Sequence, residues 1–270
     1  MPAAIVTGAT SGIGRALAME LASRGWDLGL TARRAAVLDE VAREIRGAHP
    51  KMRVALETVD VSDVDAAREA IRRLFVKLGD VHLVVANAGI GGAHHVGTGQ
   101  FARSRDIVAT NLIGGMATVD AAVECWRAKA GTGSRRIVGI TSVAGFRGLP
   151  GSSAYSASKA GFSVYLEAAR GEIRQLGIDV VDIAPGFIDT PLNQDVKSRP
   201  FLIDPADGAK RIVDLIEGGT RRSTVPVWPW TAIGWLMRTI PDGVWTRLSG
   251  GLHRAASRGA TRPAAGGSGD

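Results

Sequence analysis

Short apolar runs alternate with longer segments of helical periodicity along most of the chain. The apolar runs are rich in Val, Ile and Leu, which is typical of strands, whereas the longer segments repeat apolar residues every three or four positions, as amphipathic helices do. The pattern predicts strands at residues 3–7, 27–32, 53–59, 81–86, 136–141, 179–183 and 224–227, and helices at residues 13–24, 35–46, 64–77, 103–129, 153–175 and 204–216.

The regular alternation of strand and helix determines the expected architecture. Strands separated by helices of this length form right-handed βαβ units and a parallel sheet. The runs Val81–Val85 and Ile137–Ile140 are apolar almost throughout, as in strands covered on both faces. We therefore expect one α/β domain over residues 1–227, with a doubly wound, mostly parallel seven-stranded sheet and helices on both faces.

The sequence changes character after residue 227. Four of the six tryptophans lie in residues 228–254, namely Trp228, Trp230, Trp235 and Trp245. Arginines alternate with apolar residues there and just beyond, namely Arg238, Arg247, Arg254 and Arg258. Such a stretch can form a lid over a substrate cleft, an oligomer contact or an amphipathic surface at a membrane. We favour the first two, and we expect the Gly-, Ala-, Arg- and Ser-rich residues 255–270 to be disordered.

Composition and charge narrow the class of protein. The chain has 270 residues, 45% of them hydrophobic, and a formal net charge of +7. From residue 221 onward seven arginines face only Asp242 and Asp270, so this segment alone carries +5 and the rest is nearly balanced. No basic stripe or known motif indicates nucleic-acid binding. The single Cys125, read as a packed thiol, and the absence of a signal peptide or an 18-residue apolar run favour a cytoplasmic protein.

A Gly-rich turn follows the first predicted strand and leads into the first helix. Glycines let the backbone approach a pyrophosphate, and the helix N-terminus favours the anion. The spacing is Gly-x3-Gly-x-Gly, which differs from the standard dinucleotide fingerprint, and a plain β–α turn is the alternative interpretation. The candidate cofactor contacts in this turn are Gly8, Thr10, Ser11, Gly12, Ile13 and Gly14.

The end of the second predicted strand indicates which dinucleotide is bound. An acidic residue at this point would hold the ribose 2′-hydroxyl of NAD, but the chain has Ala32 there, followed by Arg33 and Arg34. Guanidinium groups offer charge and forked donors for a 2′-phosphate, and Arg15 could add to them. The sequence thus predicts NADP(H), with NAD(H) as the alternative; the arginines could instead only cap a helix start.

A Tyr and a Lys one helical turn apart form a candidate acid–base device. Tyr155 and Lys159 stand at i and i+4 in a predicted helix, with Ser142 a short distance upstream. Moving a phenol's pKa from about 10 to about 7 needs about 4 kcal/mol, much of which one close cation in a cleft can supply. A surface helix with an incidental Tyr and Lys is the alternative for this pair alone.

Together these residues resemble the short-chain dehydrogenase/reductase family over about residues 3–227. Its landmarks occur in the family's order, and after the glycine turn they are Asp60-Val61, Asn87-Ala88-Gly89, Asn111, Ser142, Tyr155-x3-Lys159, Pro185-Gly186, Ile188 and Thr190. The resemblance implies a Rossmann fold. It also implies further cofactor contacts, namely Asp60, Val61, Asn87, Ala88, Gly89, Tyr155, Lys159, Pro185, Gly186, Ile188 and Thr190. One departure is Ala86, where the family often has a second Asn.

The resemblance also implies a role for each of four residues. Tyr155 would give or take the proton of the substrate oxygen, and Lys159 would lower its pKa and contact the nicotinamide ribose. Ser142 would hydrogen-bond the substrate oxygen, and Asn111 would hold a water in a proton relay. We therefore expect an NADP(H)-dependent oxidoreductase that interconverts a carbonyl and an alcohol. A non-catalytic dinucleotide-binding or sensing protein on the same fold is the alternative.

The positions that flank this site by family analogy are mostly apolar, which favours a hydrophobic carbonyl or alcohol substrate unless they only pack the loops. They are Ile90, Gly91, Val143, Ala144, Gly145, Phe146, Leu149 and Phe187. His94 and His95 are expected to be a solvated loop pair, because no further ligands at useful spacing accompany them. The family commonly forms dimers or tetramers through two long helices, here 103–129 and 153–175.

Overall fold

Seven parallel strands form one sheet in the order β3-β2-β1-β4-β5-β6-β7. The structure is a computed structural model that describes residues 1–128, 133–196 and 198–258, with side chains up to residue 251. The strands are β1 Ala3–Thr7, β2 Asp27–Ala32, β3 Val54–Thr58, β4 Val81–Ala86, β5 Arg135–Ile140, β6 Ile178–Pro185 and β7 Arg222–Val225. The predicted doubly wound, seven-stranded architecture is confirmed.

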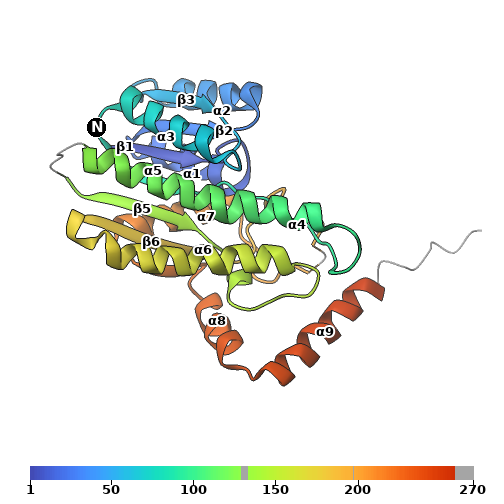
Figure 1. Ribbon diagram of the computed structural model, residues 1–270. Helices are drawn as coiled ribbons and strands as arrows, with labels where there is room; N and C mark the ends of the chain where they lie inside the picture. The colour runs from blue at the N-terminus through green and yellow to red at the C-terminus, as the bar shows by residue number, and fades with distance from the viewer. Residues whose placement is uncertain (129–132, 197, 259–270) are drawn as a thin grey trace, which may run out of the picture.

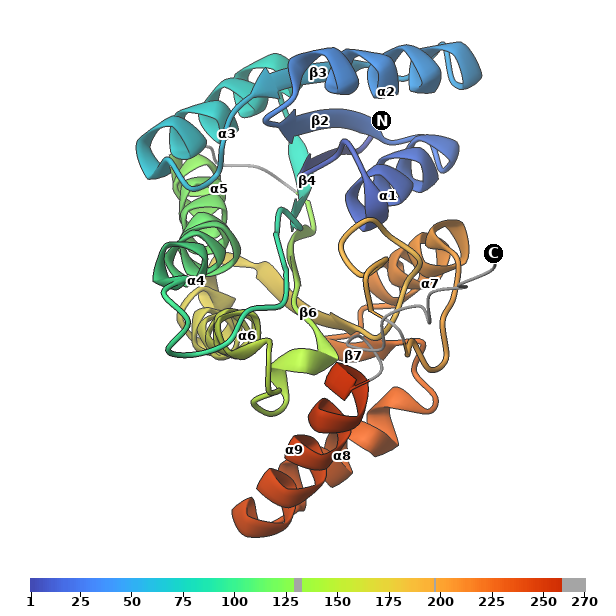
Figure 2. The same cartoon turned by 90° about the vertical axis from the view of Figure 1, so that its right-hand side faces the viewer.

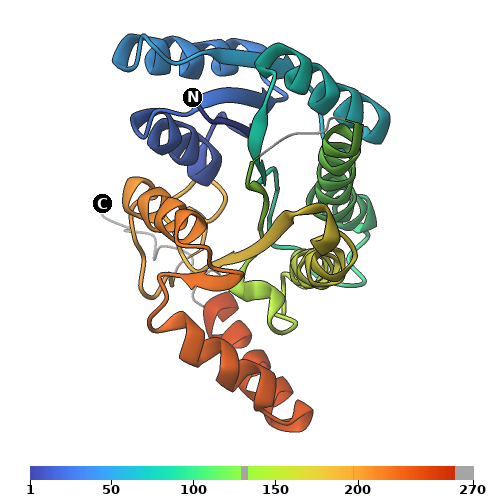
Figure 3. The same ribbon diagram turned by 90° about the vertical axis from the view of Figure 1, so that its left-hand side faces the viewer.

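Helices cover both faces of the sheet, as Figures 2 and 3 show. One face carries α1 Gly12–Ser23, α2 Ala35–Ala48 and α7 Pro205–Glu217. The other carries α3 Val64–Leu78, α5 Gly114–Ala128 and α6 Ser153–Glu172, with α4 Phe101–Val108 and the π-helical turn η1 Ala109–Ile113 continuing into α5. Short 3₁₀ turns lie at η2 Val143–Gly145 and η3 Arg174–Leu176.

The alternation of side chains along each strand divides the core into two layers. On β1, Ala4 and Val6 pack toward α1 and α7, whereas Ala3 and Ile5 pack toward α3 and α5. All five residues of β1 are buried, as a central parallel strand covered on both faces requires. The half-buried Cys125 packs against the second layer, in line with the predicted packed thiol.

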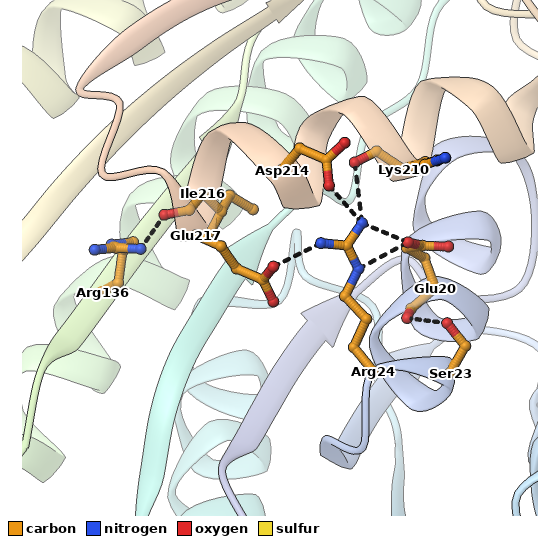
Figure 4. A network of polar contacts seen from close by, with 8 residues as sticks. All are labelled: Glu20, Ser23, Arg24, Arg136, Lys210, Asp214, Ile216 and Glu217. Atoms are coloured by element: carbon orange, nitrogen blue, oxygen red, sulfur yellow. Dashed lines mark hydrogen bonds and ion pairs between the residues drawn. The ribbon is translucent and has the colours of Figure 1, made fainter.

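Arg24 ties α1 to α7 across the first face (Figure 4). Its guanidinium contacts Glu20 on its own helix at 2.6 Å and reaches Asp214 at 2.7 Å and Glu217 at 2.6 Å on α7. These three carboxylates hold the pKa of Arg24 above its ordinary value although burial acts in the opposite direction. The cluster joins the C-terminal end of α1 to α7, and the Gly-rich turn lies at the opposite end of α1.

The element boundaries differ from the sequence prediction by one to three residues at many ends. Strand β7 ends at Val225 because Pro226 has no N–H to continue the ladder, so the predicted strand 224–227 is shifted. The helix predicted at 103–129 begins at Phe101, and its last residue, 129, lies outside the described residues. The continuous helix Phe101–Ala128 is long and apolar enough to span a membrane, but 61% of its most apolar window is buried, as in a core helix.

Two helices follow the sheet and project below it in Figure 1: α8 Trp230–Thr239 and α9 Asp242–Arg258. Arg147, in the loop after η2, donates to the carbonyl oxygens of Met237 and Ile240 and pairs with Asp242, so it clamps the junction between the two helices. Helix α9 ends at Arg258, four residues into the stretch that the sequence predicts to be disordered. Residues 259–270 of that stretch lie outside the described residues.

Candidate active site

The loops that follow β1, β4, β5 and β6 meet at the carboxyl edge of the sheet. The strand order reverses between β1 and β4, and crevices outside such a reversal are where doubly wound sheets bind ligands. The sequence-predicted site residues come from these loops, from the last residue of β6, from the loops after β2 and β3, and from the helices beside them.

The Gly-rich turn after β1 fits closely against its neighbours. Gly8 and Gly12 have φ of +71° and +53°, a region that favours glycine. A Cβ on Gly8 would lie 2.8 Å from the Cα of Ala88, one on Gly12 would lie 3.1 Å from the side chain of Thr190, and one on Gly14 would collide with the Gly8 carbonyl. Helix α1 then begins with no side-chain cap and no acidic residue in its first turn.

This bare turn at a helix N-terminus fits the phosphates of a dinucleotide, because the first N–H groups of α1 lack side-chain acceptors. The strand end of β4 holds the turn in place. Asn87 donates through Nδ2 to the Thr7 carbonyl at 2.8 Å, and the backbone N–H groups of Asn87 and Ala88 donate to the Thr7 hydroxyl at 3.0 and 3.1 Å. Asn87 and Ala88 therefore position the turn from the adjacent strand.

Basic residues surround the end of β2. The Arg33 guanidinium lies 3.5 Å from Asp60, and Arg34 donates to the Thr10 hydroxyl at 3.5 Å. Burial raises the pKa of Asp60, but hydrogen bonds from Ser62 and the charge of Arg33 outweigh burial, and the pKa is lowered. Arg15 instead pairs with a glutamate of α2. Val61, next to Asp60, is buried and its carbonyl lies against Gly114 of α5.

Tyr155 stands in the first turn of α6, and Ser142, at the cap of η2, lies near its phenol. Ser142 ends the β5 loop as the cap of η2, where its Oγ accepts from the Ala144 N–H at 3.1 Å. Ser142 can therefore cap η2 and still lie beside the Tyr155 phenol. Burial raises the pKa of the Tyr155 phenol, and the hydrogen bond with Ser142 lowers it by less.

Lys159 lies one turn further along α6, with its Nζ 5.9 Å from the centroid of the Tyr155 ring. The ammonium is buried and donates to the Ile140 carbonyl at 2.8 Å. Burial lowers its pKa to about 8, and the charge of Asp182 acts in the opposite direction. In this structure the ammonium lies against a carbonyl and burial raises the pKa of the phenol, so the expectation that Lys159 lowers the pKa of Tyr155 stays a prediction.

Asn111 stands in the π-helical turn η1, a feature that often marks functional positions. Its Oδ1 accepts from the Ile90 N–H at 2.8 Å, and its Nδ2 donates to the Ile90 carbonyl at 2.9 Å and to Ser158 at 3.1 Å. A Cβ on Gly89 would lie 3.3 Å from Asn111 and 3.4 Å from the Lys159 Nζ. Gly89 therefore allows the close approach of the β4 loop to both side chains.

The loop after β6 is the last of the four loops at the carboxyl edge of the sheet. The Gly186 N–H, next to Pro185, donates to the Val225 carbonyl at 2.9 Å. Ile188 forms a bridge with Ile203, and Thr190 is buried against Gly12 of the Gly-rich turn. The Pro185–Thr190 segment thus faces the turn at which the phosphates would bind.

An aromatic cluster lies beside Gly186. Trp230 of α8 is buried against the Gly186 Cα and meets Phe187 and Phe201 edge-on, each at 5.9 Å between ring centroids. Phe146 packs against Gly234 of the same helix. Helix α8 therefore forms one wall beside the candidate active site. Sequence reasoning placed Trp230 only in a tryptophan-rich segment, because contact with residues 29 to 44 positions away leaves no local pattern.

The two histidines after β4 differ from each other. His94 is 4% exposed, and its Nε2 lies 2.7 Å from the Ser104 hydroxyl, so the expectation of a solvated pair is wrong for this residue. Its backbone N–H donates to the Gly151 carbonyl, which joins the β4 loop to the start of α6. His95 is exposed. Over residues 1–128, 133–196 and 198–251, no group of three or more His, Cys, Asp or Glu is arranged to hold a metal ion.

Comparison with known proteins places this site in a family. The sequence profile of the short chain dehydrogenases matches residues 2–200. An uncharacterized oxidoreductase of Mycobacterium tuberculosis is 33% identical over 246 residues, which cover 91% of this chain and 96% of that protein.

Two solved structures share the fold. An alcohol dehydrogenase from Thermococcus sibiricus, complexed with 5-hydroxy-NADP, has a TM-score of 0.74 at 24% identity, covering 83% of this chain and 95% of that one. A short chain dehydrogenase/reductase from Burkholderia phymatum, in complex with NAD, has a TM-score of 0.76 at 22% identity, covering 88% and 92%. The family profile and the relative show that this chain is an oxidoreductase of the short-chain dehydrogenase/reductase family.

Proposed function

We propose that the chain is an NADP(H)-dependent oxidoreductase that interconverts a carbonyl and an alcohol on a hydrophobic substrate, with Tyr155 as the general acid and base. The observation that carries this proposal is the convergence of Ser142, Tyr155, Lys159 and Asn111 at the sheet edge that also holds the bare Gly-rich turn. A nicotinamide dinucleotide would supply or accept the hydride when bound.

Each side chain has a chemical task in this proposal. In the reductive direction the Tyr155 O–H bond breaks and its proton passes to the substrate oxygen; in oxidation the phenolate takes that proton back. The raised pKa of Tyr155 keeps the phenol protonated near neutral pH, which suits an acid. Ser142, within reach of the same phenol, would donate to the substrate oxygen as its charge grows. Lys159 would contact the nicotinamide ribose, and Asn111 would hold a water that returns the proton from solvent.

The preference for NADP(H) rests on the end of β2. Ala32 provides no carboxylate for a ribose 2′-hydroxyl, whereas Arg33, held by Asp60, and Arg34, near Thr10, present cations beside the Gly-rich turn. A charge-assisted hydrogen bond contributes about 1.5–3 kcal/mol, so losing one arginine should weaken NADPH binding about 10- to 150-fold. NADH binding to Arg34→Ala should stay unchanged. Equal losses for NADPH and NADH would contradict the 2′-phosphate assignment.

Turnover separates this proposal from a non-catalytic binding protein. The wild-type chain should consume NADPH with some member of a panel of apolar ketones and aldehydes, followed by NADPH absorbance. NADPH fluorescence measured without substrate reports binding on its own. Clear binding without turnover on any member of a broad panel would favour a non-catalytic dinucleotide sensor.

We further propose two roles for residues 228–254. Their inner side, with Trp230 against Gly186, serves as a wall of the substrate cleft. Their outer side serves as a contact with anionic membrane surfaces, because Trp228 is 75% and Trp235 68% exposed in a segment whose arginines outnumber its acids. The other exposed apolar residues of this segment are Leu236, Val244 and Leu248.

Flotation with vesicles tests the membrane contact. The chain should bind phosphatidylserine-containing vesicles in low salt, and Trp235→Ser should reduce that binding, whereas Val76→Ser, at an exposed apolar position on α3, should not. The oligomeric state is measured in parallel by light scattering. If Trp235→Ser dissociates a dimer or tetramer without changing vesicle binding, this surface joins copies of the chain and the membrane proposal fails.

A further inference from the structure

A buried carboxylate that the proposed chemistry does not use lies beneath the candidate active site. Asp182 is on β6 and only 2% exposed. Its Oδ1 accepts a hydrogen bond from the Thr141 hydroxyl at 2.6 Å, and its Oδ2 accepts one from the Ser163 hydroxyl at 2.6 Å. A carboxylate in this environment is costly unless it is paired, so a specific arrangement holds it there.

The two hydroxyl partners belong to the two elements that hold Lys159. Thr141 directly follows Ile140, whose carbonyl accepts the hydrogen bond from the Lys159 Nζ at 2.8 Å. Ser163 lies four residues after Lys159, hence on the same side of α6 one turn further on. The Asp182 carboxylate therefore bridges the end of β5 and the turn of α6 that fix the ammonium on either side.

A chain of charges leads from this carboxylate to the surface. The Arg222 Nε of β7 lies 3.3 Å from Asp182, its Nη2 donates to Ser163 at 2.9 Å, and its Nη1 lies 3.5 Å from Glu167. Arg222 thereby neutralises part of the negative charge of Asp182. Besides Asp182 itself, the titratable and charged groups that face Lys159 or this network are Tyr155 and Glu167 on α6, Arg222 on β7 and Arg238 on α8.

The charge of Asp182 acts on Lys159 in a known direction. Burial disfavours the ammonium and lowers the pKa of Lys159 to about 8, while the negative charge of Asp182 raises it. Without that charge, burial would act alone and the lysine would lose its proton nearer neutral pH. A neutral amine is a weaker electrostatic partner for the phenol and for any bound ribose hydroxyl.

We propose that Asp182 is a positioning residue that keeps Lys159 charged and fixed in the site, without touching the substrate. Its effect on turnover rests on the proposed function, whereas its effect on the charge of Lys159 does not. The experiment therefore measures the two effects separately.

The titration of Lys159 is followed by NMR in protein labelled with ¹³C-lysine, in the full chain. The sequence has six lysines, and Lys159→Met assigns the signal. In Asp182→Asn, which keeps the shape of the side chain and removes its charge, Lys159 should titrate about one to two pH units lower than in the wild type. Asp179→Asn is the matched control, because Asp179 lies on the same strand but is exposed and pairs with Arg136.

A second variant gives a shift of opposite sign and protects the test against misfolding. Arg222 lies near the surface, so Arg222→Gln should fold, and it unmasks the charge of Asp182. Lys159 should then titrate at higher pH than in the wild type. An unchanged Lys159 titration in folded Asp182→Asn, or in Arg222→Gln if the first does not fold, overturns the proposal.

Turnover is then measured across pH for the same variants. The alkaline limb of kcat should move to lower pH in Asp182→Asn, with wild-type rates recovered at low pH. A uniform loss of kcat at all pH values, with a lower Tm, would mean that Asp182 only supports the fold, and it would overturn the catalytic part of the proposal. If the wild type turns over no substrate, the proposed function fails while the NMR titration still decides the charge effect.

Discussion

Asn111 should be a strong determinant of stability as well as of turnover, and replacing it by Ala tests the geometry of the π-helical turn. The amide makes three hydrogen bonds: it accepts from the Ile90 N–H at 2.8 Å and donates to the Ile90 carbonyl at 2.9 Å and to Ser158 at 3.1 Å. It is 1% exposed, so solvent cannot readily replace these contacts. Truncation leaves the part-buried N–H and carbonyl of Ile90 without this partner, and it removes a donor to Ser158, whose hydroxyl still donates to the Tyr155 carbonyl.

The cost can be estimated from those contacts. At a net value of about 1 kcal/mol for each hydrogen bond, Asn111→Ala should lower the free energy of unfolding by about 3 kcal/mol. For a chain of this size that corresponds to a fall in Tm of about 6–12 °C. Urea unfolding followed by circular dichroism measures the first quantity, and a thermal scan measures the second.

Asn193→Ala is the matched control for this loss. Asn193 makes one short hydrogen bond, from Nδ2 to the Ile188 carbonyl at 2.8 Å, so its truncation should cost about 1 kcal/mol. Surface substitutions change the free energy of unfolding by less than about 0.5 kcal/mol. If Asn111→Ala changes it by no more than that, the hydrogen bonds between Asn111 in η1 and Ile90 in the β4 loop do not form in solution.

Three further outcomes follow from the described contacts. Burial lowers the pKa of Lys159 from 10.5 to about 8, so between these pH values the folded state binds fewer protons than the unfolded state and the free energy of unfolding should rise with pH. Urea unfolding measured across this pH range should show the rise in the wild type and not in Lys159→Met. An equal dependence on pH in the two proteins would argue against a buried ammonium. Gly14→Ala places a Cβ against the Gly8 carbonyl and should weaken NADPH binding at least tenfold, about 1.4 kcal/mol, as measured by fluorescence titration. Gly47→Ala, where a Cβ meets open space, should leave NADPH binding unchanged. Arg24→Met should lower the free energy of unfolding by about 1 kcal/mol, less in high salt, and a salt-independent loss would contradict the ion-pair account.

Much of the fold could be predicted because it follows from local periodicity. Every predicted strand has a counterpart, and β4 has the predicted bounds, Val81–Ala86. Two of the ends that were missed depend on single residues: Pro226 ends β7, and Asp204, which accepts from two N–H groups, sets the start of α7 at Pro205. Neither effect appears in the hydrophobic pattern itself.

Some residues of the candidate site could likewise be predicted from the sequence, and others could not. Tyr155 and Lys159 could be placed together from helical spacing, and the order of the landmarks brought in Ser142 and Asn111. The polar network around Asp182 could not be foreseen, because its members come from β5, α6, β6 and β7 and meet only in the folded chain. The pKa of Tyr155 depends on burial in the folded chain, which the spacing does not encode.

The central claim is that Tyr155 transfers the proton while other residues bind the dinucleotide, and Tyr155→Phe tests it most directly. The variant removes one hydroxyl from a side chain whose ring lies beside Lys159. On a carbonyl substrate found in the ketone panel, its turnover of NADPH should fall by a factor of about 10²–10⁴ or more, with the Kd for NADPH unchanged by fluorescence. Wild-type turnover by Tyr155→Phe on that substrate would contradict the account.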